Sequence, residues 1–339
     1  MKLYSIIIKP ESSFGTPLKG DTIFGHICWQ AAYDDSLLKG GLKKWADCYT
    51  EKPFAVFSSA WPVFLESQKN KSWFAFKRPD LPPSMLFRDT ASDKRRYMET
   101  RKDNLKKKWM KVGEDLKINI NEQAFLNSSD LLKACPECKS TKGGFIENFE
   151  RQHNSINRLT GTTGEGFAPY SVDAFVYYPT VELAIFVLID EEATDIKRIQ
   201  DGLTRIGQSG FGRDASTGMG RFSLGEVEEL PVPKPREGDA LYTMSPSIPD
   251  SALCKDCLFT PFVRYGRHGD VMAKSGRPFK SPVIMADEGA VIIPKDSRLS
   301  EKPYLGKGIK GISKVNDFVT IHQGYSIYLP FKLPAGVEL

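Results

Sequence analysis

The chain has 339 residues, of which 40% are hydrophobic and 26% charged, and its formal net charge is +5. This balance excludes a disordered or fibrous protein, and the length suits two compact domains. No run of about 18 apolar residues is present, and the first apolar stretch is too short for a signal peptide, so we expect a cytoplasmic protein that does not enter a membrane.

The first predicted elements are a strand and a helix. Residues 2–9 alternate enough for a strand, and residues 22–28 repeat apolar side chains at helical spacing, with Thr22 as a possible cap. Lys19 and Gly20 stand directly before this helix, where free amides and the helix dipole favour an anion. A capped turn without a ligand is the simpler alternative.

A strongly basic run occupies residues 93–111. Within it Met98, Leu105 and Trp109 form a narrow apolar stripe, which predicts a helix with one docked edge. Most runs of this kind are solvated faces, but an aromatic side chain among cations also fits a contact with RNA or with a protein. Both interpretations stay open.

Two apolar runs, residues 172–178 and 181–188, are predicted to pair as a hairpin across Pro179. Residues 196–206 then show the period of an amphipathic helix. This order of elements indicates a split ferredoxin-like unit and not a parallel doubly wound sheet. The proline-rich residues 230–238 indicate a linker to a second domain of short strands. Those strands are predicted at residues 258–264, 283–285, 290–293 and 318–329.

Six cysteines include two Cys-x-x-Cys pairs. In a reducing compartment such pairs favour a metal site or free thiols over disulfides. Four thiolates, from Cys135, Cys138, Cys254 and Cys257, would form a closed structural zinc site. The long gap between the pairs weakens this interpretation, so unmetallated thiols remain an alternative. A redox pair is less favoured, because no βαβ pattern surrounds the motif.

The most specific segment is glycine-rich and spans residues 207–222, between the predicted helix and a strand at 221–227. Dense glycines let backbone amides approach phosphates closely. Neither nucleotide-binding spacing is present, because G-x-x-x-x-G-K-[ST] is absent and Ala215 interrupts G-x-G-x-x-G, so no nucleotide cofactor is predicted. A glycine-rich turn without a ligand is the alternative. The candidate contacts are Gly210, Gly212, Gly218 and Gly220 by their amides, and Arg213, Ser216, Thr217 and Arg221 by their side chains.

Four segments resemble the RAMP superfamily of CRISPR proteins. They are residues 16–29, residues 153–161, the glycine-rich residues 210–222, and residues 322–325. Together they are most similar to the subunits of type III-A (Csm) effector complexes that hold the 5′ handle of the guide RNA. The resemblance spans both ends of the chain.

The resemblance implies an α+β fold with two ferredoxin-like (RRM-like) domains, residues 1–229 and 230–339. The first would carry a long basic insertion at about 59–145 and a protruding thumb hairpin at about 145–170. It implies no catalytic centre, and it implies as partners the guide RNA, the large cyclase- or polymerase-type subunit and the RAMP backbone subunit. The insertion is longer and more basic than the resemblance implies, and the cysteine pairs are not part of the pattern of the superfamily as a whole.

Single-stranded RNA is held by cationic and amide contacts to phosphate and by aromatic stacking. By position in the resemblance, His153, Asn154 and Arg158 lie on the thumb along the RNA. The remaining predicted RNA contacts are Lys19, Gly20, Phe211, His322 and Tyr325. For Phe211 the alternative is packing in the core.

Catalysis is the main competing interpretation, because some members of the superfamily cut CRISPR repeat RNA without metal by activating a 2′-hydroxyl. The chain has four histidines, at 26, 153, 268 and 322. No His-Lys or His-Tyr pair stands out as an activated site, and His26 is read as a core or helix-end residue. A scaffold that binds only protein is a third interpretation, but it gives the glycine-rich segment no functional role.

Overall fold

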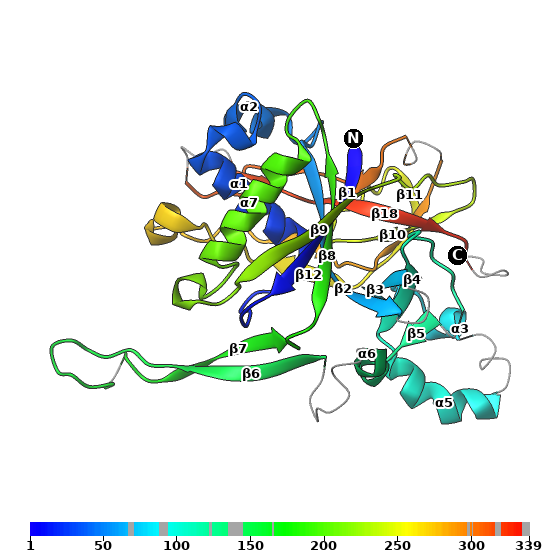
Figure 1. Cartoon of the computed structure of the whole chain (residues 1–339), viewed down its shortest axis with the longest axis horizontal. Coiled ribbons are helices and arrows are strands. Elements are labelled where there is room, and N and C mark those ends of the chain that lie inside the picture. Colours follow the sequence, from blue (N-terminus) through cyan, green and yellow to red (C-terminus); the bar gives the residue numbers. More distant parts are fainter. Residues whose placement is uncertain are drawn as a thin grey trace.

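The computed structural model describes residues 1–66, 71–87, 94–121, 124–134, 145–164, 166–296, 299, 301–315 and 320–333. Its helices and antiparallel sheets confirm the predicted α+β class (Figure 1). Across these ranges no helix is both long and apolar enough to span a membrane.

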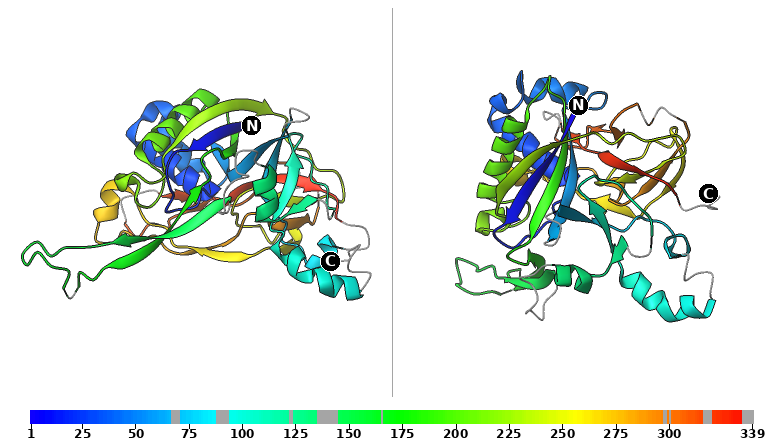
Figure 2. Two further views of the ribbon diagram at one scale, coloured as in Figure 1. Left: turned by 60° about the horizontal axis from the view of Figure 1, so that its bottom comes forward. Right: turned by 45° about the vertical axis from the view of Figure 1, so that its right-hand side comes forward.

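A seven-stranded sheet in the order β5-β4-β3-β2-β8-β1-β9 dominates the N-terminal part. Strand β1 pairs antiparallel with both β8 and β9, and β8 pairs with β2 on its other edge. Helices α1 and α7 cover one face of this sheet, and the C-terminal strands lie on the other (Figure 2). These elements are β1 (Lys2–Pro10), α1 (Gly20–Tyr33), β2 (Ala55–Glu66), β8 (Glu182–Ile189), α7 (Ile196–Ser209) and β9 (Phe222–Leu230).

Helix α7 forms as its apolar spacing predicts. Ile199, Leu203 and Ile206 are buried on one face, and the Asp195 carboxylate caps the helix by accepting the amide of Arg198 at 3.0 Å. Helix α1 differs from its prediction at the start. Its N-cap is Lys19 with no side-chain cap bond, so Thr22 lies inside the helix.

The predicted hairpin between residues 172–178 and 181–188 is wrong. Strand β7 (Tyr170–Tyr177) pairs over its whole length with β6 (Ile146–His153), and these two strands form the thumb, which protrudes from the body (Figure 1). A strand has only two edges, and both edges of β8 are taken by β1 and β2. The thumb therefore extends beyond the predicted end at residue 170.

The helix within the basic run is shorter than predicted. Helix α5 (Lys94–Lys106) ends before Trp109, which lies in strand β4 (Trp109–Gly113) because β3 (Lys71–Lys77) offers it an edge for pairing. Met98 is 70% exposed, so the predicted apolar stripe is not docked along its length. The insertion also contains α3 (Pro83–Leu86), β5 (Phe125–Leu126) and α6 (Ser128–Ala134), and before it lie η1 (Asp35–Leu37) and α2 (Gly41–Cys48).

A five-stranded sheet in the order β11-β14-β10-β18-β15 forms most of the C-terminal part. Two short pairs, β12 with β13 and β16 with β17, flank it. The predicted strands at 258–264 and 318–329 are each divided, because the chain turns between β11 and β12 and between β17 and β18. The strands are β10 (Ala240–Thr243), β11 (Cys254–Leu258), β12 (Pro261–Arg264), β13 (Val283–Ala286), β14 (Val291–Pro294), β15 (Tyr304–Gly306), β16 (Ile309–Lys310), β17 (Ile321–His322) and β18 (Tyr325–Phe331), with a 3-10 turn, η5, at Asp270–Lys274.

Both sheets contribute to one continuous hydrophobic core. Its residues come from the central strands β2 and β8 of the first sheet and also from β10 and β18 of the second sheet. Gln323, just before β18, joins the sheets by two buried hydrogen bonds to the backbone of Phe57 in β2. The predicted division of the chain near residue 230 stays a prediction.

Candidate nucleic-acid interface

The glycine-rich loop, residues 210–221, connects α7 to β9 through a backbone that needs glycine. Gly212 has φ of +75°, and a Cβ there would lie 2.5 Å from the Cβ of Thr16. Gly220 has φ of +73°, and a Cβ there would overlap the carbonyl oxygen of Phe211. Only glycine meets both the left-handed conformation and the close approach.

The amides of this loop are already used inside the protein. Gly212 donates to Nε2 of His26 at 3.2 Å, and Gly220 donates to the Ser13 carbonyl at 2.7 Å. Gly210 and Gly218 donate to the carbonyls of Ile206 and Ala215 at 2.8 and 3.0 Å. Each amide has one proton. The structure therefore corrects the prediction that these four amides hold phosphates, because the glycines instead shape the loop.

The loop and the base of the thumb meet in what we call the thumb–loop junction, residues 151–153, 170–173 and 213–217. The Arg151 guanidinium donates to Thr217 Oγ1 at 3.2 Å, and that of Arg213 donates to the Asp173 carbonyl. His153 stacks on Tyr170 and has its Nε2 3.7 Å from a carboxylate oxygen of Asp214. Arg213 is thus a connection between loop and thumb as well as a surface cation.

The thumb is fixed at its base and exposed at its tip. Phe14 and Phe175 exchange two backbone bonds of 2.7 and 3.0 Å, and their rings stack at 5.9 Å. At the tip, residues 157–162 close a turn in which Leu159 is 95% exposed. Asn154 and Arg158, both predicted RNA contacts, are exposed on this segment. The junction and the tip thus present polar and cationic groups to solvent.

Solved structures provide the comparison that decides the fold. The chain is similar to Csm4 in a Csm1-Csm4 cassette in complex with cA4, with a TM-score of 0.57, 14% identity, and coverage of 99% of this chain and 100% of that one. The same holds for the cassette in complex with pppApA, with a TM-score of 0.56 and 14% identity over the same shares. A Csm3-Csm4 subcomplex of the type III-A CRISPR-Cas interference complex gives 0.54 and 16%, covering 98% and 100%. The chain has the fold of Csm4. No family model and no curated protein matches its sequence.

Within this Csm4 fold the start of α1 does not offer a free anion site. Lys19 forms ion pairs with Asp287 and with Glu288, the latter at 3.0 Å, so the chain itself supplies the anion that was predicted there. Burial, together with the neighbouring Asp287 carboxylate, raises the pKa of Glu288 to about 7, although the charge of Lys19 lowers it. Gly20 is buried, and a Cβ there would overlap the carbonyl of Phe57. Gly20 is therefore covered, and the partly exposed Lys19 is already paired with two carboxylates.

Three further predicted contacts belong to the interior of the Csm4 fold. Tyr325 is 3% exposed, and its hydroxyl donates to the Thr50 carbonyl at 2.6 Å. Phe211 is buried against the ring of His26, and His322 is buried beside the Asp21 carboxylate at 3.7 Å. A buried ring cannot stack on a base. The structure thus corrects these assignments in favour of core packing.

The histidines fit structural roles better than catalysis, with one exception. Burial lowers the pKa of His26 to about 4, which keeps its ring a neutral acceptor for the Gly212 amide. Burial also lowers the pKa of His322 and of His268, and His268 lies 3.1 Å from the Ser313 hydroxyl. The exception is His153, whose Nε2 is buried without a hydrogen-bond partner among the described residues.

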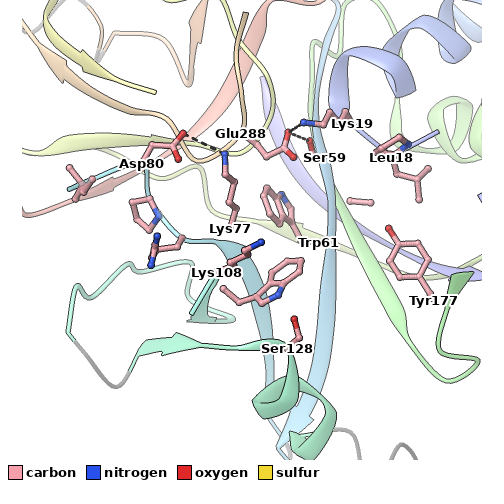
Figure 3. Close-up of a pocket in the computed structure, with 16 residues that line it drawn as sticks. Leu18, Lys19, Ser59, Trp61, Lys77, Asp80, Lys108, Ser128, Tyr177 and Glu288 are labelled. Carbon is pink, nitrogen blue, oxygen red and sulfur yellow. Dashed lines mark hydrogen bonds and ion pairs between the residues drawn. The ribbon is translucent and has the colours of Figure 1, made fainter. Parts of the chain in front are cut away.

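A cavity of about 500 Å³ lies where the insertion, the thumb base and the turn between β13 and β14 meet (Figure 3). The sequence reasoning missed it, because its walls come from segments far apart in the chain and none has a motif. Aromatic, cationic and acidic side chains face it together. They are Trp61, Trp109 and Tyr177, then Lys19, Lys77, Arg78 and Lys108, and then Asp80 and Glu288.

One of the two cysteine pairs lies among the residues that the structure describes. Cys254 and Cys257 lie on β11, partly buried against the same small hydrophobic cluster. Burial raises the pKa of both thiols, that of Cys257 to about 12. Cys135 and Cys138 lie outside the described residues. In the part of the chain that is described, no group of three or more His, Cys, Asp or Glu side chains could hold a metal.

Proposed function

We propose that the chain is a non-catalytic RNA-binding subunit of a type III-A CRISPR (Csm) effector complex. In this role it holds the 5′ handle of the guide RNA and joins a large cyclase-type subunit to the RAMP backbone subunits. The observation that carries the proposal is the fold. The structural match to Csm4 extends over 99% of this chain and 100% of the Csm4 chain. Both parts of the chain, residues 1–229 and 230–339, are taken as ferredoxin-like domains in this proposal.

The geometry supports RNA binding at the thumb and its junction with the glycine-rich loop. Arg158 and Arg221 are exposed, and Arg151 at the thumb base donates to the loop hydroxyl of Thr217. Ser216 and Thr217 add exposed hydroxyl groups on the loop. Single-stranded RNA binds to such arrays of cations and small donors through its phosphates, with little dependence on sequence.

The test is the salt dependence of guide-RNA binding. Replacing Arg151, Arg158 and Arg221 with alanine should lower affinity at every RNA sequence and reduce the slope of log K against log salt by about 0.7 for each lost phosphate contact. Lys197→Ala, on the exposed side of α7, is the matched control and should change neither quantity. Unchanged affinity and slope in the triple variant, or no copurification with guide RNA and a large subunit, would refute the proposal.

Metal-independent RNA cleavage is a second candidate, favoured by one observation. His153 lies between Asp214 and Tyr170 at the thumb–loop junction, and its Nε2 has no hydrogen-bond partner among the described residues. A histidine held in this way can take a proton from a 2′-hydroxyl. Cleavage of repeat RNA in EDTA, lost with 2′-deoxy RNA and with His153→Ala, would establish this function. Intact RNA in all three reactions would exclude it.

We also propose a structural zinc ion held by Cys135, Cys138, Cys254 and Cys257. Support comes from Cys254 and Cys257, which share one short strand and one hydrophobic cluster, as two ligands of a closed site would. Elemental analysis should find about one zinc per chain, lost in Cys254→Ser and in Cys135→Ser but kept in Cys48→Ser. Metal-free protein after mild purification would contradict this.

A further inference from the structure

The cavity behind the thumb base is separate from the surface that the proposed interface uses. Its volume of about 500 Å³ is within the range of sites for small ligands and is large enough for one nucleotide. The end of β3, the start of β4 and the base of the thumb contribute residues to its lining (Figure 3). What it can bind follows from its walls.

Two tryptophans line the cavity, and one of them is exposed enough to contact a base. Trp61 is 3% exposed, its Nε1 donates to the Met244 carbonyl at 3.2 Å, and its ring meets Phe76 edge-on at 5.0 Å. Trp109 is partly exposed, and its ring meets Phe145 edge-on at 6.3 Å. The partly exposed ring of Trp109, held in this way, can stack a planar base without first losing side-chain freedom, whereas the buried ring of Trp61 only closes the wall.

The charges of the cavity are unbalanced in favour of an anion. Lys19 is paired with Glu288 at 3.0 Å, and Lys77 with Asp80 at 3.4 Å. Among the described residues no carboxylate lies within ion-pair distance of Arg78 or Lys108, and the Arg78 guanidinium uses one N–H on the Asn104 carbonyl at 3.0 Å, which leaves others for a ligand. These two cations are neighbours, because the amide of Arg78 donates to the Lys108 carbonyl at 2.8 Å. A phosphate group is the anion that suits a guanidinium beside an ammonium.

Glu288 gives the cavity a means of reading a base. One carboxylate oxygen is engaged by Lys19 at 3.0 Å and lies 3.4 Å from the Ser59 hydroxyl. A carboxylate has about four acceptor sites, so further donors can still be accepted. Carboxylates accept from exocyclic amino groups, such as that of cytosine, whereas uracil presents only oxygen there.

We propose that this cavity takes one nucleotide of the bound RNA, with its base turned out of the strand against Trp109 and its phosphate at Arg78 and Lys108. The occupant is a base with an exocyclic amino group, cytosine or adenine, in preference to uracil. This inference rests on the proposed function in RNA binding.

The experiment measures the affinity of the full chain for labelled oligocytidine and oligouridine of equal length. Trp109→Ala should weaken oligocytidine binding by about tenfold, as expected for loss of one stacked base, and Trp109→Phe should keep most of the affinity. Lys108→Ala should weaken both oligonucleotides by several-fold and tests an exposed position that does not affect folding. Glu288→Gln should reduce the ratio of the affinity for oligocytidine to the affinity for oligouridine. Ultraviolet crosslinking should map to the peptide that contains Trp109.

The outcomes separate this inference from the proposed function. If the thumb arginine variants lose RNA affinity while Lys108→Ala and Trp109→Ala keep it, the cavity inference is overturned and the function stands. If wild-type protein binds no RNA, both fail. If CMP alone quenches Trp109 fluorescence but RNA affinity is unchanged in Trp109→Ala, the site serves a free nucleotide and the inference is overturned. If Trp109→Ala instead releases a protein subunit with RNA affinity intact, the occupant is a protein, and the inference is equally wrong.

Discussion

At the scale of single residues, Gly212 and Gly218 have the same backbone requirement and different surroundings. Gly218 has φ of +91° and open space where a Cβ would lie, whereas at Gly212 a Cβ would meet Thr16 at 2.5 Å. We expect Gly218→Ala to lower the free energy of unfolding by about 1 kcal/mol, the cost of the left-handed conformation. Gly212→Ala should lose about 2 kcal/mol more through the steric overlap. Urea unfolding measures both, and equal losses would contradict the role given to Thr16.

Glu288 should make the free energy of unfolding depend on pH. Burial raises the pKa of its carboxyl from 4.5 to about 7 in the folded chain. The folded state therefore holds a proton that the unfolded state releases, so this contribution is complete below about 4.5 and is lost as the pH rises through 7. The free energy of unfolding of wild type minus that of Glu288→Gln should fall across this window, by no more than about 3 kcal/mol. A flat difference would show that Glu288 does not titrate there.

At the scale of elements, the thumb should be removable without loss of the fold. Its tip is exposed, and its attachment is the Phe14–Phe175 contact at the base. Replacing residues 154–169 with Asn-Gly would join His153 to Tyr170 by a two-residue hairpin turn. The melting temperature should change by a few degrees at most, while guide-RNA affinity should fall by about tenfold, or about 1.4 kcal/mol.

The base of the thumb should behave in the opposite way. Phe175→Ala removes a ring that stacks on Phe14 and meets Tyr177 edge-on, so it should cost about 2 kcal/mol of stability or more. Loss of RNA affinity should be smaller than in the trimmed thumb when both are compared well below their melting temperatures. The assignment of the base as the attachment and of the tip as the RNA contact would be wrong if the protein with the trimmed thumb unfolded. It would also be wrong if that protein bound guide RNA normally.

At the scale of the whole molecule, the two sheets should unfold together. Gln323 is fully buried, and its side-chain amide accepts from the Phe57 amide at 2.9 Å and donates to the Phe57 carbonyl at 2.7 Å. Gln323→Leu would leave both backbone groups buried and unpaired, at a cost of about 2 to 5 kcal/mol. Gln200→Leu on α7 is a control at a less buried site and should stay within about 0.5 kcal/mol. Tryptophan fluorescence and circular dichroism should report one common transition, whereas two separate transitions would show that the domains are independent.

Periodic and local features were determined by the sequence alone. The spacing of Ile199, Leu203 and Ile206 was enough to predict α7, because side chains three and four positions apart along the chain share one face of a helix. The α+β class followed from the order of such elements. The glycine-rich loop was found as a special backbone, since glycine adopts positive φ at little cost and four of its glycines do so.

Tertiary structure decided everything that depends on which strands pair and which side chains are covered. The run at 170–177 joined β6 and not β8, because β8 had no free edge, and this created the thumb. Phe211, Tyr325 and the loop amides turned inward, so a motif typical of phosphate binding serves mainly to shape the junction. The cavity of Trp61, Trp109 and Glu288 has no sequence signal, because its chemistry arises only when distant segments meet.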